Sequence, residues 1–387
     1  MGGQMVLPGI QLRELRRTYG FEEVAIVPGD VTTNPDLSRT DLSIGPYNFT
    51  IPILASAMDA IVDPQFAGLM ASAGGLGVMN LEGLYCRYED PTDALKEISS
   101  APKENVTDVL QRVYTAKFNE NLVGRRVEEI KATGAVAAVS VTPQGTKRLA
   151  PLAVEAGADI IVVQSTVTTA RHISNSFTGL RLNELTSQIG VPVLVGNTVT
   201  SSASLELMEQ GIDGILVGVG PGAACTTRDV TGVGVPQVSA TLEVAAARDE
   251  FFARTGKYVT VITDGGIRIG GDFCKAIAAG ADGVMIGTPF AQTNEAPGGG
   301  FNWGMASPHP ALPRGTRINV GVRASLDEVL FGPSHRTDGT QNLVGALQIS
   351  MSMVGAQTVK EFHEKAELVV APTIATEGKI FQRSGQI

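Results

Sequence analysis

Short runs of apolar and β-branched residues recur along the chain, and each run is closed by Gly, Ser, Asn or Asp. Eight such runs stand at residues 51–57, 76–80, 136–141, 159–164, 191–197, 214–220, 259–266 and 283–287. The runs are apolar on both faces, which is typical of parallel strands buried between a core and a layer of helices. The pattern therefore predicts eight parallel strands.

Helical patterns separate most of these runs. Residues 63–74, 146–157, 202–211 and 271–280 each end in the glycine expected just beyond a helix C-terminus. Eight strand–helix units predict an α/β fold of the TIM (β/α)8 barrel type, with residues 1–387 as one catalytic domain. A doubly wound open sheet is consistent with the same alternation, but the number of units and the length of the chain favour the barrel.

Composition narrows the class of protein. The 387 residues are 43% hydrophobic and carry 39 acidic against 30 basic residues, a net charge of −9, which argues against nucleic acid or an anionic membrane as a partner. Three cysteines without CxxC spacing argue against a disulfide framework or a zinc site. With no signal pattern and no apolar run near the ~20 residues of a membrane span, we expect a soluble, cytoplasmic protein.

In a TIM barrel the chemistry belongs at the C-terminal ends of the strands. One such end, in the stretch GVGPGAACTTRDVTGVGVPQ at 218–237, holds Cys225 between a glycine-rich turn and two threonines. A thiol there is exposed to a substrate and is a candidate nucleophile, although most free cysteines are buried and inert. The inert reading fits Cys274 better, because Cys274 lies on the apolar side of a helical pattern.

Two further strand ends have the composition of phosphate-binding turns. The sequences DGGIRIGGD at 264–272 and IGTPF at 286–290 follow the seventh and eighth runs, where TIM barrels commonly bind phosphate through backbone amides. A carboxylate such as Asp264 is suited to accept hydrogen bonds from ribose hydroxyls. Together these turns predict a nucleoside monophosphate as ligand.

These residues also resemble those of a known family, the IMP dehydrogenases and GMP reductases. The matching motifs are ASAMD, AGGLGV, VGN, GPGAACTTR, GVGVPQ, DGGIRIGGD, AAGADGVMIG, EAPG and WGM, and the run at 343–367 is similar to the last helices of the family. The resemblance covers most of the chain. It implies that IMP or a related purine monophosphate is the substrate.

The resemblance also implies a mechanism. Cys225 would add to C2 of IMP, hydride would pass to NAD, and water would release XMP, with Thr227 helping to position that water. Arg314 or Arg317, in a mobile flap near 295–339, would activate the water. A monovalent cation, K⁺ in the family, would be held by Gly220, Gly222 and the Cys225 carbonyl, with Glu377 of the partner subunit as a further contributor to a homotetramer or octamer.

Substrate and cofactor contacts follow from the same matches. Asp264 would hold the ribose, and Gly266, Gly287 and Thr288 the phosphate, with Gly265 as a further substrate-binding residue. The purine pocket and the cysteine loop would contribute Ser56, Met58, Asn197, Gly222, Gly304 and Met305. Where dehydrogenases carry an Asp for the nicotinamide ribose, this chain has Gln164, Ser165 and Thr166, which we expect to contact the cofactor. It also has Ala223 where the family usually has a phosphate-binding serine.

The choice of reaction depends on two absences. Residues 81–135 form a segment too short for the regulatory CBS modules of longer dehydrogenases. A GMP reductase would have GMSSES near Met305, whereas this chain has GMASPHP, without the glutamate used in deamination. We therefore expect IMP oxidation, with GMP reduction or a catalytically silent purine-nucleotide-binding protein as the alternatives.

Overall fold

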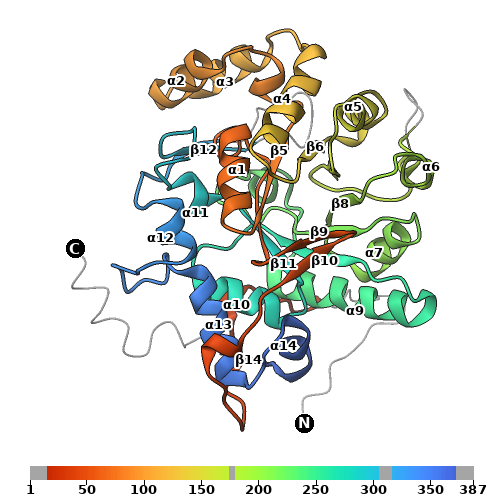
Figure 1. Cartoon of the computed structure of the whole chain (residues 1–387), viewed down its shortest axis with the longest axis vertical. Coiled ribbons are helices and arrows are strands. Elements are labelled where there is room, and N and C mark those ends of the chain that lie inside the picture. The colour runs from red at the N-terminus through yellow and green to blue at the C-terminus, as the bar shows by residue number, and fades with distance from the viewer. Residues whose placement is uncertain (1–14, 174–178, 305–315, 372–387) are drawn as a thin grey trace, which may run out of the picture.

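A computed structural model describes residues 15–173, 179–304 and 316–371. Its centre is a closed barrel of eight strands in the order β10-β11-β4-β5-β6-β7-β8-β9, and every neighbouring pair is parallel (Figure 1). The strands are β4 (Ile53–Ala55), β5 (Leu76–Asn80), β6 (Ala138–Val141), β7 (Ile160–Gln164), β8 (Val193–Thr198), β9 (Gly214–Val217), β10 (Thr260–Asp264) and β11 (Gly283–Ile286). Each coincides with one of the eight apolar runs, with only β8 extending one residue beyond its run, so the TIM barrel prediction is confirmed.

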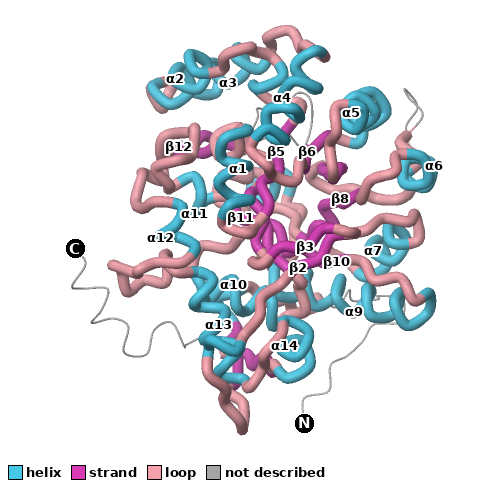
Figure 2. Tube along the Cα trace, viewed as in Figure 1, coloured by secondary structure: helices cyan, strands magenta, loops and turns pink. Residues whose placement is uncertain are grey.

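Helices surround this barrel, as Figure 2 shows with the strands gathered at the centre. Those that connect successive barrel strands are α1 (Pro64–Ser72), α2 (Thr92–Ser100), α3 (Val106–Tyr114), α4 (Asn121–Ala132), α5 (Pro143–Glu155), α6 (Leu182–Gln188), α7 (Ser201–Met208), α8 (Thr227–Thr231), α9 (Gln237–Thr255) and α10 (Gly270–Ala278). After β11 come α11 (Thr288–Ala291), α12 (Leu326–Leu330), α13 (Leu343–Val354) and α14 (Val359–Lys365). Each of the four predicted helical segments overlaps a helix, namely α1, α5, α7 and α10.

The apolar runs on both faces of the strands are explained by two cores. In β9, Leu216 lies in the barrel interior, while Ile215 and Val217 belong to the larger core under the helices. This alternation follows from the two-residue period of a strand. One end of the interior is closed by a hairpin of β2 (Leu42–Ile44) and β3 (Tyr47–Phe49), whose Leu42, Ile44 and Phe49 pack into the same interior core. The barrel is thus filled with side chains at the end where its strands begin.

Smaller elements complete the described chain. Strands β1 (Val24–Val27) and β14 (Glu367–Val370) pair antiparallel, which brings the two ends of the described chain together. Short 3-10 helices stand at η1 (Phe21–Glu23), η2 (Pro35–Leu37) and η3 (Leu84–Cys86). Within the predicted flap, β12 (Phe301–Trp303) pairs antiparallel with β13 (Arg317–Asn319). The central part of that flap, 305–315, lies outside the described residues. Among the helices that are described, none is long and apolar enough to cross a membrane.

Candidate functional site

A cavity of about 1360 Å³ opens at the C-terminal ends of the barrel strands. It collects side chains that are far apart in sequence, because parallel strands all end at the same rim. The predicted residues that line it are Ser56, Met58, Gln164, Ser165, Thr166, Asn197, Gly220, Gly222, Cys225, Thr227, Asp264, Gly265, Gly266, Gly287, Thr288 and Gly304. These candidates, chosen from separate strand ends, therefore share one cavity.

Cys225 stands in the loop between β9 and α8 and is partly exposed. Its thiol donates to the hydroxyl of Thr227 at 3.2 Å, and its backbone N–H donates to the carbonyl of Gly222 at 3.0 Å. Thr227 is itself buried as the first residue of α8. The thiol and a hydroxyl are thus held side by side at the wall of the cavity.

The other two cysteines are in a different environment. Cys86 and Cys274 are buried, and burial raises the pKa of each thiol to about 12. Neither is ionised near neutral pH, so neither is suited to act as a nucleophile. Cys225 is the one cysteine of the chain that lines the cavity.

Arg228 holds the cysteine loop through hydrogen bonds to two of its carbonyls. Its Nε donates to the carbonyl of Val219 at 3.1 Å and its guanidinium NH2 group to that of Val235 at 2.7 Å. Gly220 makes this arrangement possible, because its φ is +75° and an added Cβ would lie 2.5 Å from Cγ of Arg228. The loop therefore closes around an arginine that is part of the CTTR motif but was not among the predicted site residues.

Gln237 ties two strand ends together at the base of the loop. The side-chain amide of this buried residue donates to the carbonyl of Val217 at 2.7 Å and to that of Asp264 at 3.0 Å. Gly218 lies against the hydrogen bond between Gln237 and Asp264. An added Cβ there would stand 2.3 Å from the Asp264 carbonyl oxygen and 2.8 Å from the Gln237 amide nitrogen. Sequence reasoning missed Gln237 as a site residue, although it ends the quoted GVGVPQ motif.

Asp264 is the centre of a polar cluster at the ends of β7, β8 and β10. Its Oδ2 accepts hydrogen bonds from the side-chain amides of Gln164 and Asn197, each at 2.8 Å, and Gln164 also donates to Oδ1 of Asn197 at 3.1 Å. Burial raises the pKa of Asp264 to about 6, against the lowering effect of the two amide donors. Neither of these two hydrogen bonds uses Oδ1 of Asp264, so that oxygen can accept from a ligand.

The predicted phosphate turns stand beside this cluster. Gly265 and Gly266 have φ values of +85° and +80°, in the left-handed region that favours glycine, and pack against Pro221 of the cysteine loop. At the end of β11, an added Cβ on Gly287 would lie 3.6 Å from both Met58 Sδ and Ser56 Oγ. The two turns, the purine-pocket candidates and the thiol loop are therefore adjacent.

On the far side of Asp264, the predicted cofactor residues form the start of a loop. Ser165 contacts the Thr168 hydroxyl at 2.9 Å, and its backbone N–H donates to the Gly196 carbonyl at 2.9 Å. The cavity is also lined by Glu82 and Thr142. The Thr142 hydroxyl donates to the Glu82 carboxylate at 3.1 Å. The side chain of Gln164 is hydrogen-bonded to Asp264 and Asn197, so this predicted cofactor residue also belongs to the polar cluster around Asp264.

The predicted site residues that remain are Arg317, Met305, Arg314 and Glu377. Arg317 is not among the side chains that line the cavity. Its guanidinium donates to the carbonyls of Ile98 and Ser99 at 2.5 and 2.9 Å. Met305, Arg314 and Glu377 fall outside the described residues. The part of the chain that is described holds no group of three or more His, Cys, Asp or Glu residues placed for a metal ion, whereas the predicted K⁺ site would use backbone carbonyls.

Comparison with known proteins gives a consistent family. Residues 18–306 match the IMP dehydrogenase / GMP reductase domain. An uncharacterized oxidoreductase of Mycobacterium leprae is 40% identical over 93% of this chain and 98% of its own length, and the inosine-5'-monophosphate dehydrogenase of Cryptosporidium parvum is 28% identical over 96% and 94%. The crystal structure of an IMP dehydrogenase/GMP reductase-like protein from Corynebacterium glutamicum superimposes with a TM-score of 0.88, at 34% identity over 95% of this chain and 97% of that one. The chain belongs to the IMP dehydrogenase / GMP reductase family.

Proposed function

We propose that the protein is an IMP dehydrogenase, which oxidises IMP to XMP with NAD through a covalent adduct on Cys225. One observation carries the proposal. A partly exposed thiol, paired with the Thr227 hydroxyl, lines the same cavity as the Asp264 cluster and two glycine turns. A nucleophile and a set of nucleotide contacts on one cavity wall fit a reaction on the base of a bound nucleotide.

The substrate would be held from the phosphate end. Backbone amides of the turns around Gly266 and Gly287 would bind the phosphate, and Thr288 at the start of α11 would add its hydroxyl. Ribose hydroxyls would donate to Asp264, whose ionised form is the stronger acceptor. The base would then extend toward Met58 and Cys225, on the walls of the same cavity.

The chemistry would take place in two steps. In the first, Cys225 Sγ would bond to C2 of the base as the thiol releases its proton to solvent, and the hydrogen on C2 would leave as hydride. In the second, water would attack the same carbon and break the C–S bond, which releases XMP and restores the thiol. Thr227, whose hydroxyl stands 3.2 Å from Sγ, is placed to orient that water. Splitting the reaction in this way separates oxidation from hydrolysis.

NAD would supply the hydride acceptor. A volume of about 1360 Å³ is larger than the ~300–1,000 Å³ typical of a pocket for one small ligand, so the residues present fit a nucleotide together with a nicotinamide. Ser165 and Thr166 would line the nicotinamide side, with Gln164 between them and the ribose cluster. The carbonyls of Gly220, Gly222 and Cys225 would hold K⁺ and order the thiol loop. Arg314 stays a prediction as the group that activates water.

Paired assays test the function. Purified protein with IMP, NAD and K⁺ should produce NADH and XMP in equal amounts, and Cys225→Ser should abolish both while IMP binding persists. The mirror assay supplies GMP and NADPH. Consumption of GMP with release of ammonia, while IMP stays inert, would establish a GMP reductase instead. Tight IMP binding with no turnover in either assay would establish a silent nucleotide-binding protein.

A further inference from the structure

The antiparallel ribbon formed by β12 and β13 contributes to the cavity wall but does not belong to the barrel. Asn302 and Gly304, on either side of Trp303, both line the cavity. Trp303 itself is buried, and its indole Nε1 donates to the hydroxyl of Tyr114 at 2.8 Å. Tyr114 is the last residue of α3, in the helical segment between β5 and β6. One ribbon strand is therefore attached to a helix outside the barrel.

The same tyrosine connects the ribbon to the first loop of the site. The Tyr114 hydroxyl donates to Oδ2 of Asp59 at 2.7 Å, and that oxygen also accepts from the backbone N–H of Leu84 at 2.7 Å. Asp59 is fully buried and directly follows Met58, which lines the cavity. A buried chain of hydrogen bonds thus runs from Trp303 through Tyr114 to the neighbour of Met58.

The second ribbon strand is attached to the helix before α3. Arg317, which pairs with Trp303 across the ribbon, donates from one guanidinium nitrogen to the carbonyls of Ile98 and Ser99 near the C-terminal end of α2. The guanidinium also lies 4.6 Å from the centre of the Phe301 ring, within the range of a cation–π contact. Cations near a helix C-terminus interact favourably with its carbonyls. Both strands are held by the α2–α3 pair, which Figure 1 shows above the barrel, near β12.

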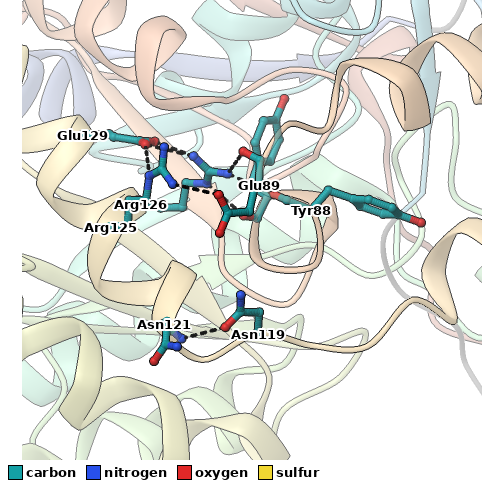
Figure 3. A network of polar contacts seen from close by, with 8 residues as sticks. Tyr88, Glu89, Asn119, Asn121, Arg125, Arg126 and Glu129 are labelled. Carbon is teal, nitrogen blue, oxygen red and sulfur yellow. Dashed lines mark hydrogen bonds and ion pairs between the residues drawn. The ribbon is translucent and has the colours of Figure 1, made fainter.

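Helices α3 and α4 are both held to the loop around residues 85–89, which follows β5. Figure 3 shows Arg126 of α4 between Glu129 and the loop that carries Tyr88 and Glu89. The buried guanidinium of Arg126 donates to the carbonyls of Tyr85, Tyr88 and Glu89 at 2.8, 3.0 and 2.7 Å and to the Glu129 carboxylate. The Tyr88 hydroxyl in turn donates to the Val113 carbonyl in α3 at 2.9 Å. A fixed position of α3 gives the Tyr114 contact a fixed point of attachment.

We propose that Tyr114 and Arg317 are positioning residues. They anchor the β12–β13 ribbon to the α2–α3 helices and so fix Asn302 and Gly304 at the cavity wall. Neither side chain touches the cavity itself. Buried polar groups that lose a partner are costly, so removing either contact favours an arrangement in which the ribbon leaves its place. The inference rests on the proposed function only where IMP is used as a probe.

The sole tryptophan of the chain allows a test that is independent of activity. Trp303 emission is excited selectively, and its quenching by acrylamide measures access to the indole. Quenching should be weak in the wild-type protein and rise roughly three-fold or more in Tyr114→Phe and in Arg317→Gln, because either change frees the ribbon. Tyr47→Phe is the matched control, since it removes a tyrosine hydroxyl that donates to Asp159 at 3.0 Å and contacts neither the ribbon nor the α2–α3 helices.

Unchanged quenching in both anchor variants overturns the proposal, and so does an equal rise in Tyr47→Phe, which would indicate general loosening. If Tyr114→Phe fails to fold, Arg317→Gln, at a partly exposed position, carries the same test. Arg317→Lys should recover part of the effect, because an ammonium can still donate to the Ile98 and Ser99 carbonyls but lacks the planar guanidinium.

A functional arm uses IMP and NAD. In both anchor variants kcat should fall about ten-fold or more, while the Kd of IMP changes much less, because the proposed phosphate and ribose contacts come from residues outside the ribbon. A normal kcat in variants whose quenching has risen would show that the ribbon does not position the site. If wild-type protein fails to bind or turn over IMP, the proposed function fails, and the quenching series still decides the anchor.

Discussion

The raised pKa of Asp264 predicts how nucleotide binding responds to pH. Burial lifts this pKa from 3.8 to about 6, while the amides of Asn197 and Gln164 oppose the shift. The carboxylate is then almost fully ionised at about pH 7.5, but only about one tenth ionised at about pH 5. Ribose hydroxyls bind the ionised form more strongly, because charge-assisted hydrogen bonds are roughly twice as strong as neutral ones.

The expected magnitude follows from that fraction. If the ionised form carries the ribose contact, the affinity for IMP falls up to about ten-fold between about pH 7.5 and about pH 5. The stability of the free protein responds in the opposite sense. Because the pKa of Asp264 is raised on folding, the free energy of unfolding carries a penalty that is absent below pH 3.8 and complete above about pH 6. The full penalty is on the order of 3 kcal/mol, and less to the extent that water reaches the site.

Calorimetric titration of IMP across this pH range, in wild type and in Asp264→Asn, is the assay. The phosphate of the ligand ionises near pH 6 as well, so the ratio of the two dissociation constants at each pH isolates the contribution of Asp264. We expect the advantage of the wild type to shrink about ten-fold on acidification. On the same acidification, the free energy of unfolding of the ligand-free wild type should increase relative to that of the variant. A ratio that does not change with pH would refute the reasoning.

Three further predictions follow from the same geometry. At neutral pH iodoacetamide should alkylate Cys225 and spare Cys86 and Cys274, because burial raises the pKa of those two thiols to about 12. Bound IMP should protect Cys225 from alkylation, and peptide mapping that finds all three cysteines labelled contradicts the prediction. Gly218→Ala should lose turnover and melt earlier, because its Cβ would stand 2.3 Å from the Asp264 carbonyl oxygen, whereas Gly190→Ala, with φ +71° and open space, should cost only about 1–2 kcal/mol of unfolding free energy. Replacing K⁺ by a bulky organic cation should lower kcat without raising the Kd of IMP; equal rates in both salts argue against the cation site.

The barrel and most of its rim could be predicted from the sequence for a physical reason. Strands buried on both faces carry continuous apolar runs, and the polar residue that follows each run must lie at the common rim of the barrel. Asp264 was found in this way, while Asn197 and Gln164, which also end apolar runs, were named from the family resemblance. Their mutual hydrogen bonds were not predicted, because the identity of a partner across three strands leaves no periodic signal.

The residues that support the site show the same limit. Arg228 and Gln237 donate to backbone carbonyls, and a carbonyl is present at every position, so no sequence pattern identifies the acceptor. Arg317 was one of two flap arginines expected to activate water, yet its partners are the carbonyls of Ile98 and Ser99, on a helix that is distant in the sequence. A charged residue in a loop therefore indicates little until the packing around it is known.

The most direct test of the account is the covalent bond to Cys225. Enzyme quenched with acid during turnover of IMP and NAD is digested and analysed by mass spectrometry. The account predicts a purine nucleotide adduct on the peptide that contains residues 222–228, present only when both substrates are supplied and absent from Cys225→Ser. Steady production of XMP by the Cys225→Ser variant, with no adduct on any wild-type peptide, would contradict it.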